Sequence, residues 1–585
     1  MDKILRINMS SEGGPTTSVE SIGKYKGLGG RGMTSTIIAT EVNPKCDPLS
    51  ADNKLVIAPG IVSGTATSTS GRMSVGFKSP MTEGIKESNS GGQASQHLAK
   101  LGYAAIVIEG KPVGDDLYKI LLDKDAVKIE KANELKGLGT YDVADKIKDQ
   151  YGDKKVGLMC VGIAGENLMI NSTIAFTDPE FRPTRHAARG GGGAVMGSKA
   201  VKAIVIQADG LKLREPKDKK AFQEANRNFV KEVSAAAMTG KEGTLRQFGS
   251  AAVADVTSEL GGYPALGATQ GSWEGVAKIN GSHMVELENA RGGQPIHACH
   301  TGCTIECSAI YTNPDGTFLS KQPEYETAWS LGGYLGVNDP DKLTQMDRLC
   351  DDIGLDTIEA GVTIGVLMQG SDEFSMGNAD DGIKILEEIK SASSKGKFYG
   401  SGAYNVGKEI GYERVPVMKK QAMAAYDPRG FKGLGVTYAT SPMGGDHTAG
   451  HTLPNHLGAI EPKVEGTAIE NQWLASSNAQ IDAAASDTTG VCGFADFAGL
   501  DRPDARKYLL EAISAFTGDE WNENSWLELG KKILRTEIDF NRIAGLTEKD
   551  DKIPEWMKRE PLPPHNSVFD IPDSDLKKTI DSFYK

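Results

Sequence analysis

The pattern of apolar and polar residues differs between the first third of the chain and the rest. Residues 1–207 contain short apolar or β-branched runs separated by glycine, and the clearest runs cover residues 54–58, 104–108, 155–159 and 203–206. Short runs of this kind, bounded by turn-forming residues, are typical of buried strands. We therefore predict a β-rich N-terminal domain over residues 1–207.

A helical period begins at Asp218 and dominates the remaining sequence. The clearest helix starts at Asp339-Pro340, where an N-capping residue precedes proline at the first helical position. Its apolar residues recur at spacings of three and four, which places them on one face: Leu343, Met346, Leu349 and Ile353. The same period predicts further helices over residues 221–238, 357–369, 382–392, 503–516 and 525–541.

Strands followed by helices favour an α+β fold over a doubly wound sheet. A charged run over residues 211–217 indicates the end of the N-terminal domain. We expect a helical domain over residues 208–415, which carries three clustered cysteines, and a C-terminal helical domain over residues 416–585.

The charge balance excludes some classes of partner. The chain has 65 Lys and Arg residues against 78 Asp and Glu residues, a formal net charge of −13. An acidic surface attracts neither nucleic acid nor an anionic membrane. Residues 1–6 lack the apolar segment of a secretory signal, and no stretch approaches the ~18 consecutive apolar residues of a membrane span. We expect a cytoplasmic protein that binds neither nucleic acid nor membrane.

Three of the seven cysteines lie close together, at Cys299, Cys303 and Cys307, and Cys492 is far downstream. On one continuous helix the outer two would be about 12 Å apart, so Gly302 makes a folded loop the better interpretation. Three close thiolates and a remote one suit a [4Fe–4S] cluster. Two alternatives stay open: inert buried thiols, or a zinc site that uses the three cysteines with His297 or His300. The isolated cysteines indicate core or loop thiols: Cys46, Cys160 and Cys350.

Glycine is frequent, at 70 of 585 residues. Three glycine-rich segments also carry arginine or asparagine, at residues 69–72, 88–92 and 185–199. Exposed backbone amides and guanidinium groups bind phosphates, so these loops favour a large phosphorylated cofactor. Residues 27–32 match G-x-G-x-x-G, but a poor strand precedes them. We interpret them as a glycine turn or as backbone near another ligand, because a dinucleotide site needs strand, turn and helix together.

Taken in order along the chain, several of these segments resemble the aldehyde ferredoxin oxidoreductase family of tungsten enzymes: residues 29–32, 69–72, 88–92, 190–199, 354–357 and 487–492. The resemblance implies an N-terminal β-sheet domain that binds a tungsten bis-pyranopterin cofactor (tungstopterin), followed by two mostly helical domains. It also implies a [4Fe–4S] cluster, a Mg²⁺ ion that bridges the pterin phosphates, and reversible oxidation of aldehydes to carboxylic acids. Ferredoxin, or companion iron–sulfur and flavin subunits, would take the electrons, and the enzyme would form an oligomer.

The resemblance also assigns roles to single residues. The family's cofactor-binding positions fall on Arg72, Asn89, Gly91, Arg185, His186, Ala188, Arg189, Asp351, Leu355, Asp356, Asp487 and Val491. Its cluster ligands fall on Cys299, Cys303, Cys307 and Cys492. Its two ionisable positions beside the metal fall on Glu326 and His447, with His451 and His456 as nearby alternatives. Our hypothesis gives Glu326 the role of base and His447 the carbonyl contact and proton relay.

Some positions depart from the archaeal members of that family. Three residues separate Cys299 from Cys303, where those members have two, so the sequence is more similar to the bacterial branch. Met443 and Ala449 replace an arginine and a lysine near the cofactor, and Ala188 replaces a glycine. Gln345 falls on a glutamate of the archaeal inter-subunit metal site, so we do not predict that metal.

Two other functions compete with aldehyde oxidation. The same scaffold could reduce an aromatic-ring thioester or oxidise glyceraldehyde phosphate. A non-catalytic subunit that carries a cluster or zinc is the alternative from another class, and the glycine and arginine loops argue against it.

Overall fold

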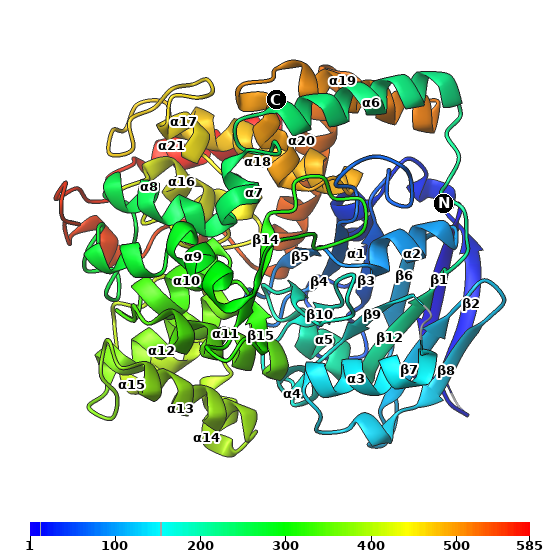
Figure 1. The fold of residues 1–585 in the computed structure, drawn as a ribbon, viewed down its shortest axis with the longest axis horizontal. Helices are drawn as coiled ribbons and strands as arrows, with labels where there is room; N and C mark the ends of the chain where they lie inside the picture. Colours follow the sequence, from blue (N-terminus) through cyan, green and yellow to red (C-terminus); the bar gives the residue numbers. More distant parts are fainter. Residues whose placement is uncertain (12, 153–154) are drawn as a thin grey trace.

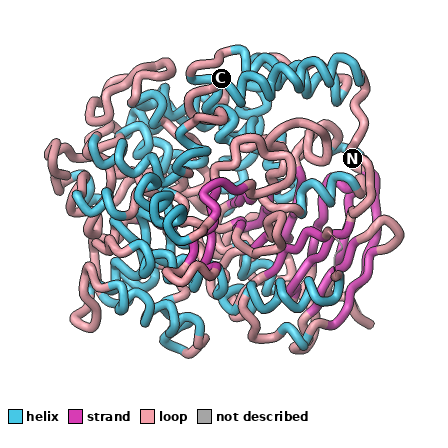
Figure 2. Tube along the Cα trace, viewed as in Figure 1, coloured by secondary structure: helices cyan, strands magenta, loops and turns pink. Residues whose placement is uncertain are grey.

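The computed structural model describes residues 1–11, 13–152 and 155–585. Two six-stranded sheets form the N-terminal region, and helices form most of the remainder (Figure 1). The strands gather on one side of the molecule, and the helices surround the other side and one end (Figure 2). This arrangement confirms the α+β class. No helix within these described ranges is both long enough and apolar enough to cross a membrane.

The first sheet has the strand order β2-β1-β6-β3-β4-β5. Its strands are β1 (Lys3–Asn8), β2 (Thr16–Ser21), β3 (Leu55–Pro59), β4 (Met73–Lys78), β5 (Ile85–Ser90) and β6 (Tyr103–Glu109). The pairing of β1 with β6 is parallel, and the other pairings are antiparallel. Every residue of β3 and β4 is buried, because helix α1 (Gly30–Glu41) contacts one face and the second sheet shares the core on the other.

The second sheet has the order β11-β10-β9-β12-β7-β8. Its strands are β7 (Tyr118–Leu122), β8 (Val127–Lys131), β9 (Val156–Cys160), β10 (Ile174–Phe176), β11 (Arg185–Ala187) and β12 (Val201–Gln207). One apolar core joins the inner faces of both sheets and also includes helix α2 (Ala94–Lys100) and helix α5 (Gly192–Ser198). The outer face of the second sheet packs against helix α3 (Thr140–Tyr151).

The predicted helices are present, with ends that differ by a few residues from the predicted ones. They are α6 (Lys219–Ala235), α11 (Pro340–Ile353), α12 (Thr357–Gly370), α13 (Ala379–Lys390), α19 (Asp504–Thr517) and α20 (Glu523–Ala544). The Asp339 carboxylate accepts hydrogen bonds from two backbone amides of the first turn of α11, as expected of an N-cap. Helix α13 starts before the predicted position because the side chain of Asn378 caps it there.

Further helices and strands complete the helical region. The helices are α7 (Thr244–Phe248), α8 (Val253–Glu259), α9 (Gly281–Arg291), α10 (Tyr325–Ala328), α14 (Ser394–Tyr399), α15 (Ala403–Ile410), α16 (Lys432–Thr440), α17 (Leu453–His456), α18 (Gln472–Thr489) and α21 (Asp573–Ser582), and short helix α4 (Ile163–Glu166) lies in the N-terminal region. Helices α6 and α19, far apart in sequence, lie side by side at one end (Figure 1).

Short strands interrupt the helical region, which the helical period did not predict. Strands β13 (Gln294–His297), β14 (Ser308–Thr312) and β15 (Phe318–Lys321) form an antiparallel sheet, and β16 (Val417–Met418) pairs with β17 (Gln421–Ala422). The loop between β13 and β14 carries the three clustered cysteines. One large apolar core includes residues from both sides of position 415, such as Trp329 and Leu434. The division at 207 and 415 stays a prediction.

Residues 27–29 lead into helix α1 and residues 30–32 form its first turn, with a 3₁₀ turn rather than a strand directly before them. Gly30 has a φ of +42°, and a Cβ atom there would lie 2.1 Å from the carbonyl oxygen of Asp487. The segment is therefore a glycine turn that packs against the end of α18, and it lacks the strand that a dinucleotide site requires. This agrees with the interpretation made from the sequence.

A buried ion pair follows directly from this turn. Arg31, 1% exposed, donates two hydrogen bonds of 2.9 and 2.8 Å to the carboxylate of Glu537 in α20. Its third nitrogen lies 3.4 Å from Asp487 in α18. The N-terminal sheet region is thus joined to two C-terminal helices through one guanidinium group.

We expect Arg31→Met to destabilise the protein by about 3–5 kcal/mol, because it leaves the Glu537 carboxylate buried without its partner. The midpoint of thermal unfolding should fall clearly below that of the unsubstituted protein. The matched control is the double variant Arg31→Met with Glu537→Leu, which removes both charges and should recover much of the loss. An unchanged midpoint for Arg31→Met alone would contradict a role of this pair in stability.

Candidate active site

The three clustered cysteines and the remote Cys492 meet beside the glycine-rich loop of residues 69–72. Cys299, Cys303 and Cys307 lie in the loop between β13 and β14, and Cys492 follows α18. The backbone of Thr69 lies between the two segments: its amide donates to Gly302 O at 3.1 Å, and its carbonyl accepts from the Cys492 amide at 2.9 Å. A loop rather than a helix therefore carries the close cysteines, as predicted from Gly302.

The electrostatics of the thiols are linked. A hydrogen bond with Cys303 holds the pKa of Cys299 well below its usual range, and the same bond raises the pKa of Cys303. Burial raises the pKa of Cys307 and of Cys492, and neighbouring thiolate charge adds to both shifts. Four half-buried thiols whose charges act on one another in this way need a cationic partner before all of them can ionise.

The spacing of the side chains disfavours a single zinc ion at the cysteines. Zinc at about 2.3 Å from each sulfur would bring the sulfurs to about 3.8 Å from one another. Among the described residues, one group of three possible metal ligands has all its donor atoms within 4.8 Å of one another. Its members are Asp178, Glu180 and His297, so no cysteine belongs to it. The four thiols therefore fit a larger, polynuclear group better than one ion.

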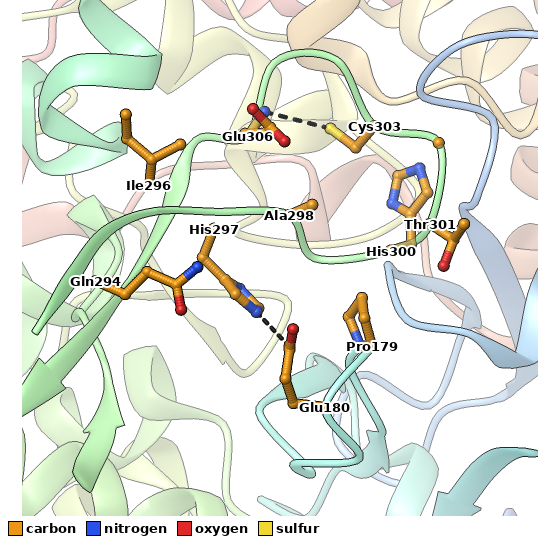
Figure 3. Close-up of a pocket in the computed structure, with 11 residues that line it drawn as sticks. Pro179, Glu180, Gln294, Ile296, His297, Ala298, His300, Thr301, Cys303 and Glu306 are labelled. Atoms are coloured by element: carbon orange, nitrogen blue, oxygen red, sulfur yellow. Dashed lines mark hydrogen bonds and ion pairs between the residues drawn. The ribbon is translucent and has the colours of Figure 1, made fainter. Parts of the chain in front are cut away.

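A pocket of about 320 Å³ opens beside the cysteine loop, next to Cys303 (Figure 3). His297 points across it toward Glu180, and the two side chains are 2.5 Å apart (Figure 3). The imidazole nitrogen that faces the pocket is thus taken by a carboxylate rather than by the thiols. Cys303 and Glu306 also line this pocket (Figure 3).

Arg72, Asn89, Gly91 and Val491 are brought together at the same place. The Arg72 guanidinium donates a 2.5 Å hydrogen bond to the Asn89 side chain, because β4 and β5 pair so that residues 73 and 90 are opposite each other. The Arg72 amide donates to Gly490 O at 3.0 Å, which holds Val491 near the loop. A Cβ atom on Gly91 would lie 3.1 Å from the Cys299 sulfur.

A second group lies at the edge of the second sheet, where His186 approaches Asp351 at 3.1 Å. Burial alone would raise the pKa of Asp351, but the charges of Lys321 and His186 hold it below its ordinary range. Lys321 donates to Asp347 and Asp351, each at 2.8 Å. This buried lysine lies outside the residues selected from the sequence, and it fixes the orientation of Asp351.

The remaining positions complete this second group. Arg189 approaches Asp356 at 3.3 Å, and Asp356 also caps α12. Leu355 donates its amide to Cys350 O at 2.8 Å and pairs with Ser172 next to β10, while Ala188 lies between His186 and Arg189.

Arg185 connects the two groups electrostatically. It is buried, pairs with Glu324 at 3.0 Å, and donates to Ser308. Its charge contributes to the lowered pKa of Cys299. A buried cation of β11, the strand that also carries His186, therefore acts on the thiols.

Glu326 and His447 form the ionisable pair. Glu326 in α10 accepts a 2.9 Å hydrogen bond from the Ala425 amide with one oxygen, and its other oxygen lies 3.2 Å from His447 Nε2. Burial raises the pKa of Glu326 to about 8 and lowers the pKa of His447 to about 4. Glu326 Oε1 and His447 Nδ1 are both buried without a hydrogen-bond partner. The pair therefore offers a carboxylate oxygen and an imidazole nitrogen to another molecule.

The loop that carries His447 is fixed from the first sheet. Lys86 in β5 is 0% exposed, and its ammonium donates to the Asp446 carboxylate at 2.7 Å and to Met443 O at 3.2 Å. Burial alone would raise the pKa of Asp446, but Lys86 and Arg189 hold it far below its ordinary value. Arg189 also donates to Gly445 O at 2.6 Å.

Lys86 is a residue that sequence reasoning missed, and nothing in its strand context marks it. Asp446 carried a weak signal, since it directly precedes His447. The alternatives His451 and His456 lie farther from Glu326: the His451 ring is 5.6 Å from that of His447, and His456 packs against Phe431. The structure also places three of the positions that differ from the archaeal family members. The Met443 sulfur accepts a hydrogen bond from the Glu87 amide, Ala449 is buried, and Gln345 is exposed.

Comparison with known proteins finds similarity along the whole chain. The family model for the aldehyde ferredoxin oxidoreductase N-terminal domain matches residues 4–208, and that for its domains 2 and 3 matches residues 224–585. The tungsten-containing aldehyde ferredoxin oxidoreductase of Pyrococcus furiosus is 31% identical over 578 residues, which cover 96% of this chain and 92% of that protein. Its namesake from Thermococcus kodakarensis is 32% identical and covers 100% and 95% respectively.

More distant similarity extends to other reactions. The WOR-like subunit of the aliphatic sulfonate oxidoreductase of Pyrococcus furiosus is 25% identical, with 100% of this chain and 93% of that protein covered. The active-site complex BamBC of benzoyl coenzyme A reductase, solved with 1,5-dienoyl-CoA, has a TM-score of 0.80 at 18% identity and covers 100% of this chain and 93% of that one. The last likeness shows the shared fold.

Proposed function

This chain belongs to the aldehyde ferredoxin oxidoreductase family of oxidoreductases, and from that premise we propose that it reversibly oxidises aldehydes to carboxylic acids. Electrons would leave through a [4Fe–4S] cluster to ferredoxin or to companion iron–sulfur and flavin subunits. The observation that carries the proposal is the meeting of the four cysteines with the Arg72–Asn89 pair at the loop of residues 69–72. The half-buried Glu326–His447 pair supplies the ionisable groups.

The residues present fit the cofactors of this family. The four thiols offer the soft ligands of an iron–sulfur cluster, namely Cys299, Cys303, Cys307 and Cys492. The pterins and their bridging Mg²⁺ would be held by Arg72, Asn89, Gly91, Arg185, His186, Ala188, Arg189, Asp351, Leu355, Asp356, Asp487 and Val491. When bound, the tungstopterin supplies two-electron redox chemistry at the carbonyl carbon of the substrate.

The Glu326–His447 pair handles the protons of the reaction. Oxidation of an aldehyde by water releases two protons and two electrons, so a base must accept a proton from water. Glu326 is suited to this task because burial brings its pKa to about 8, near the operating pH. Once Glu326 has taken this proton it can donate it in a hydrogen bond to His447 Nε2, and the Nδ1–H of that tautomer can then hold the oxygen of the former carbonyl group.

The partners and the setting follow from the same proposal. The pocket beside Cys303 brings the cysteine loop close to the surface, which suits transfer of single electrons to a docked acceptor. A cytoplasmic location and an oligomeric assembly stay predictions.

The first prediction from the proposed function concerns the elemental composition of the protein. After anaerobic purification the protein should contain tungsten, phosphorus from two pterins per tungsten, magnesium, and about four irons per chain. Elemental analysis checks all four together. One zinc per chain with neither tungsten nor molybdenum would instead support a non-catalytic, zinc-binding subunit.

The second prediction concerns the cluster. Cys303→Ser should remove or badly destabilise it, because a hydroxyl substitutes poorly for a thiolate at iron. Iron content and the rate of acceptor reduction should both fall. Cys46→Ser is the matched control, since Cys46 is buried away from the loop and should leave the iron content unchanged. Full iron content in Cys303→Ser would show that this cysteine is not a ligand.

The third prediction concerns catalysis. Glu326→Gln and His447→Asn should retain tungsten and iron but lower aldehyde turnover by about 10²–10⁴-fold, because each amide preserves shape and removes proton transfer. Viologen reduction with aliphatic and aromatic aldehydes measures the turnover, and benzoyl thioesters and glyceraldehyde phosphate serve as rival substrates. Activity confined to a rival substrate would overturn aldehyde oxidation while leaving the cofactors in place.

The pH dependence adds a separate check on Glu326. A base acts in its ionised form, so kcat/KM for aldehyde oxidation should be low below the pKa and rise as the pH passes about 8. Glu326→Gln should abolish this rise, since the amide does not titrate. A profile that is the same in both proteins would refute the role of Glu326 as the base.

A further inference from the structure

His300 lies between two cysteines of the loop and is 0% exposed. Its Nδ1 atom lies 3.2 Å from the Cys299 sulfur, within the distance of a hydrogen bond to sulfur. On the other side of the ring, the backbone amide of Gly71 donates to Nε2, also at 3.2 Å. One imidazole thus contacts both a cysteine of the proposed cluster and the loop that precedes Arg72.

The contact with Gly71 fixes the tautomer of this ring. A backbone amide has a hydrogen to donate and no lone pair to accept one, so Nε2 must be the unprotonated nitrogen. The ring proton of the neutral imidazole is therefore on Nδ1, and it points at the Cys299 sulfur. Both ring nitrogens are occupied, which argues against His300 as a zinc ligand, one of the alternatives raised by the sequence.

The packing of the ring is specific to glycine at position 71. A Cβ atom on Gly71 would lie 2.2 Å from Cδ2 and 2.4 Å from Cγ of His300. The loop therefore approaches the imidazole face through bare backbone, and any side chain at position 71 would displace the ring. Two features of the sequence that have no obvious relation, a glycine in one loop and a histidine in another, form one contact.

We propose that His300 is a positioning residue whose Nδ1–H bond to Cys299 raises the reduction potential of the [4Fe–4S] cluster. A hydrogen bond to a ligand sulfur stabilises the reduced cluster, which carries one more negative charge than the oxidised cluster. The bond to Gly71 holds the ring in the tautomer and orientation that this requires. The inference rests on the proposed function, since it presumes that the cluster is bound.

Three variants of the holoenzyme separate the two bonds of His300. His300→Asn keeps an amide donor near the position of Nδ1 and loses the acceptor for Gly71. His300→Gln has its amide near the position of Nε2 and loses the donor to Cys299. His300→Leu removes both, and His565→Leu at an exposed histidine serves as the control. The measurement is a redox titration of the cluster followed by electron paramagnetic resonance, together with iron content.

We expect the potential to shift to more negative values in His300→Leu and His300→Gln, equivalent to a roughly three- to tenfold smaller equilibrium constant for one-electron reduction. His300→Asn should stay close to the unsubstituted protein, as should His565→Leu. In protein labelled with ¹⁵N-histidine, pulsed electron paramagnetic resonance of the reduced cluster should also show a weak coupling to a histidine nitrogen. Every His300 variant should lose this coupling.

The outcomes distinguish this inference from the proposed function. Absence of a cluster signal in the unsubstituted holoenzyme would defeat the proposed function. A normal cluster whose potential is the same in all three variants would overturn only the role of His300. Equal potentials in His300→Asn and His300→Leu, or equal loss of iron from all three variants, would overturn it as well, because the retained donor would then make no difference.

Discussion

The buried ion pair between Lys86 and Asp446 sets the geometry on which the proposed chemistry depends. It fixes the loop of His447 to a strand of the first sheet, and Arg189 fixes the same loop through Gly445. Arg31 makes an equivalent connection to α18 and α20. Buried pairs of this kind gain little net stability, because both ions lose water. Their role here is to fix how the joined segments align, because a shifted segment would leave an unpaired charge in the interior.

The sequence predicted those parts of the fold that short-range patterns specify. The N-cap at Asp339 and the apolar spacing after it define α11, and the β-branched runs define the central strands. The sheet β13–β15 was missed because two of its strands, Gln294–His297 and Phe318–Lys321, mix polar with apolar residues and lack the continuous apolar run of the central strands. Lys86 was missed because its partner is 360 residues away in sequence, and only the folded chain brings them together.

In the candidate site, too, local sequence patterns predicted some features, and others depend on residues far apart in the sequence. The spacing of three cysteines and Gly302 predicted a loop, and the structure has one. The resemblance supplied Glu326 and His447, which lie 3.2 Å apart, but no pattern in either segment indicated that distance. Lys321 carries no local signal, because its role depends on partners in another segment. His300 stood out only as a possible zinc ligand, and its contact with Gly71 could not be predicted.

The Thr69 contacts have a consequence for how the protein matures. The backbone of this one residue holds the loop of Cys303 on one side and the segment of Cys492 on the other. Cys492 reaches that place only when α18 has packed against the first sheet region, which requires nearly the whole chain to have been synthesised. A nascent chain would present three thiols without the fourth. If the proposed four-thiolate cluster is bound, its insertion follows the packing of α18, and a C-terminal truncation before residue 492 would remove the fourth proposed ligand.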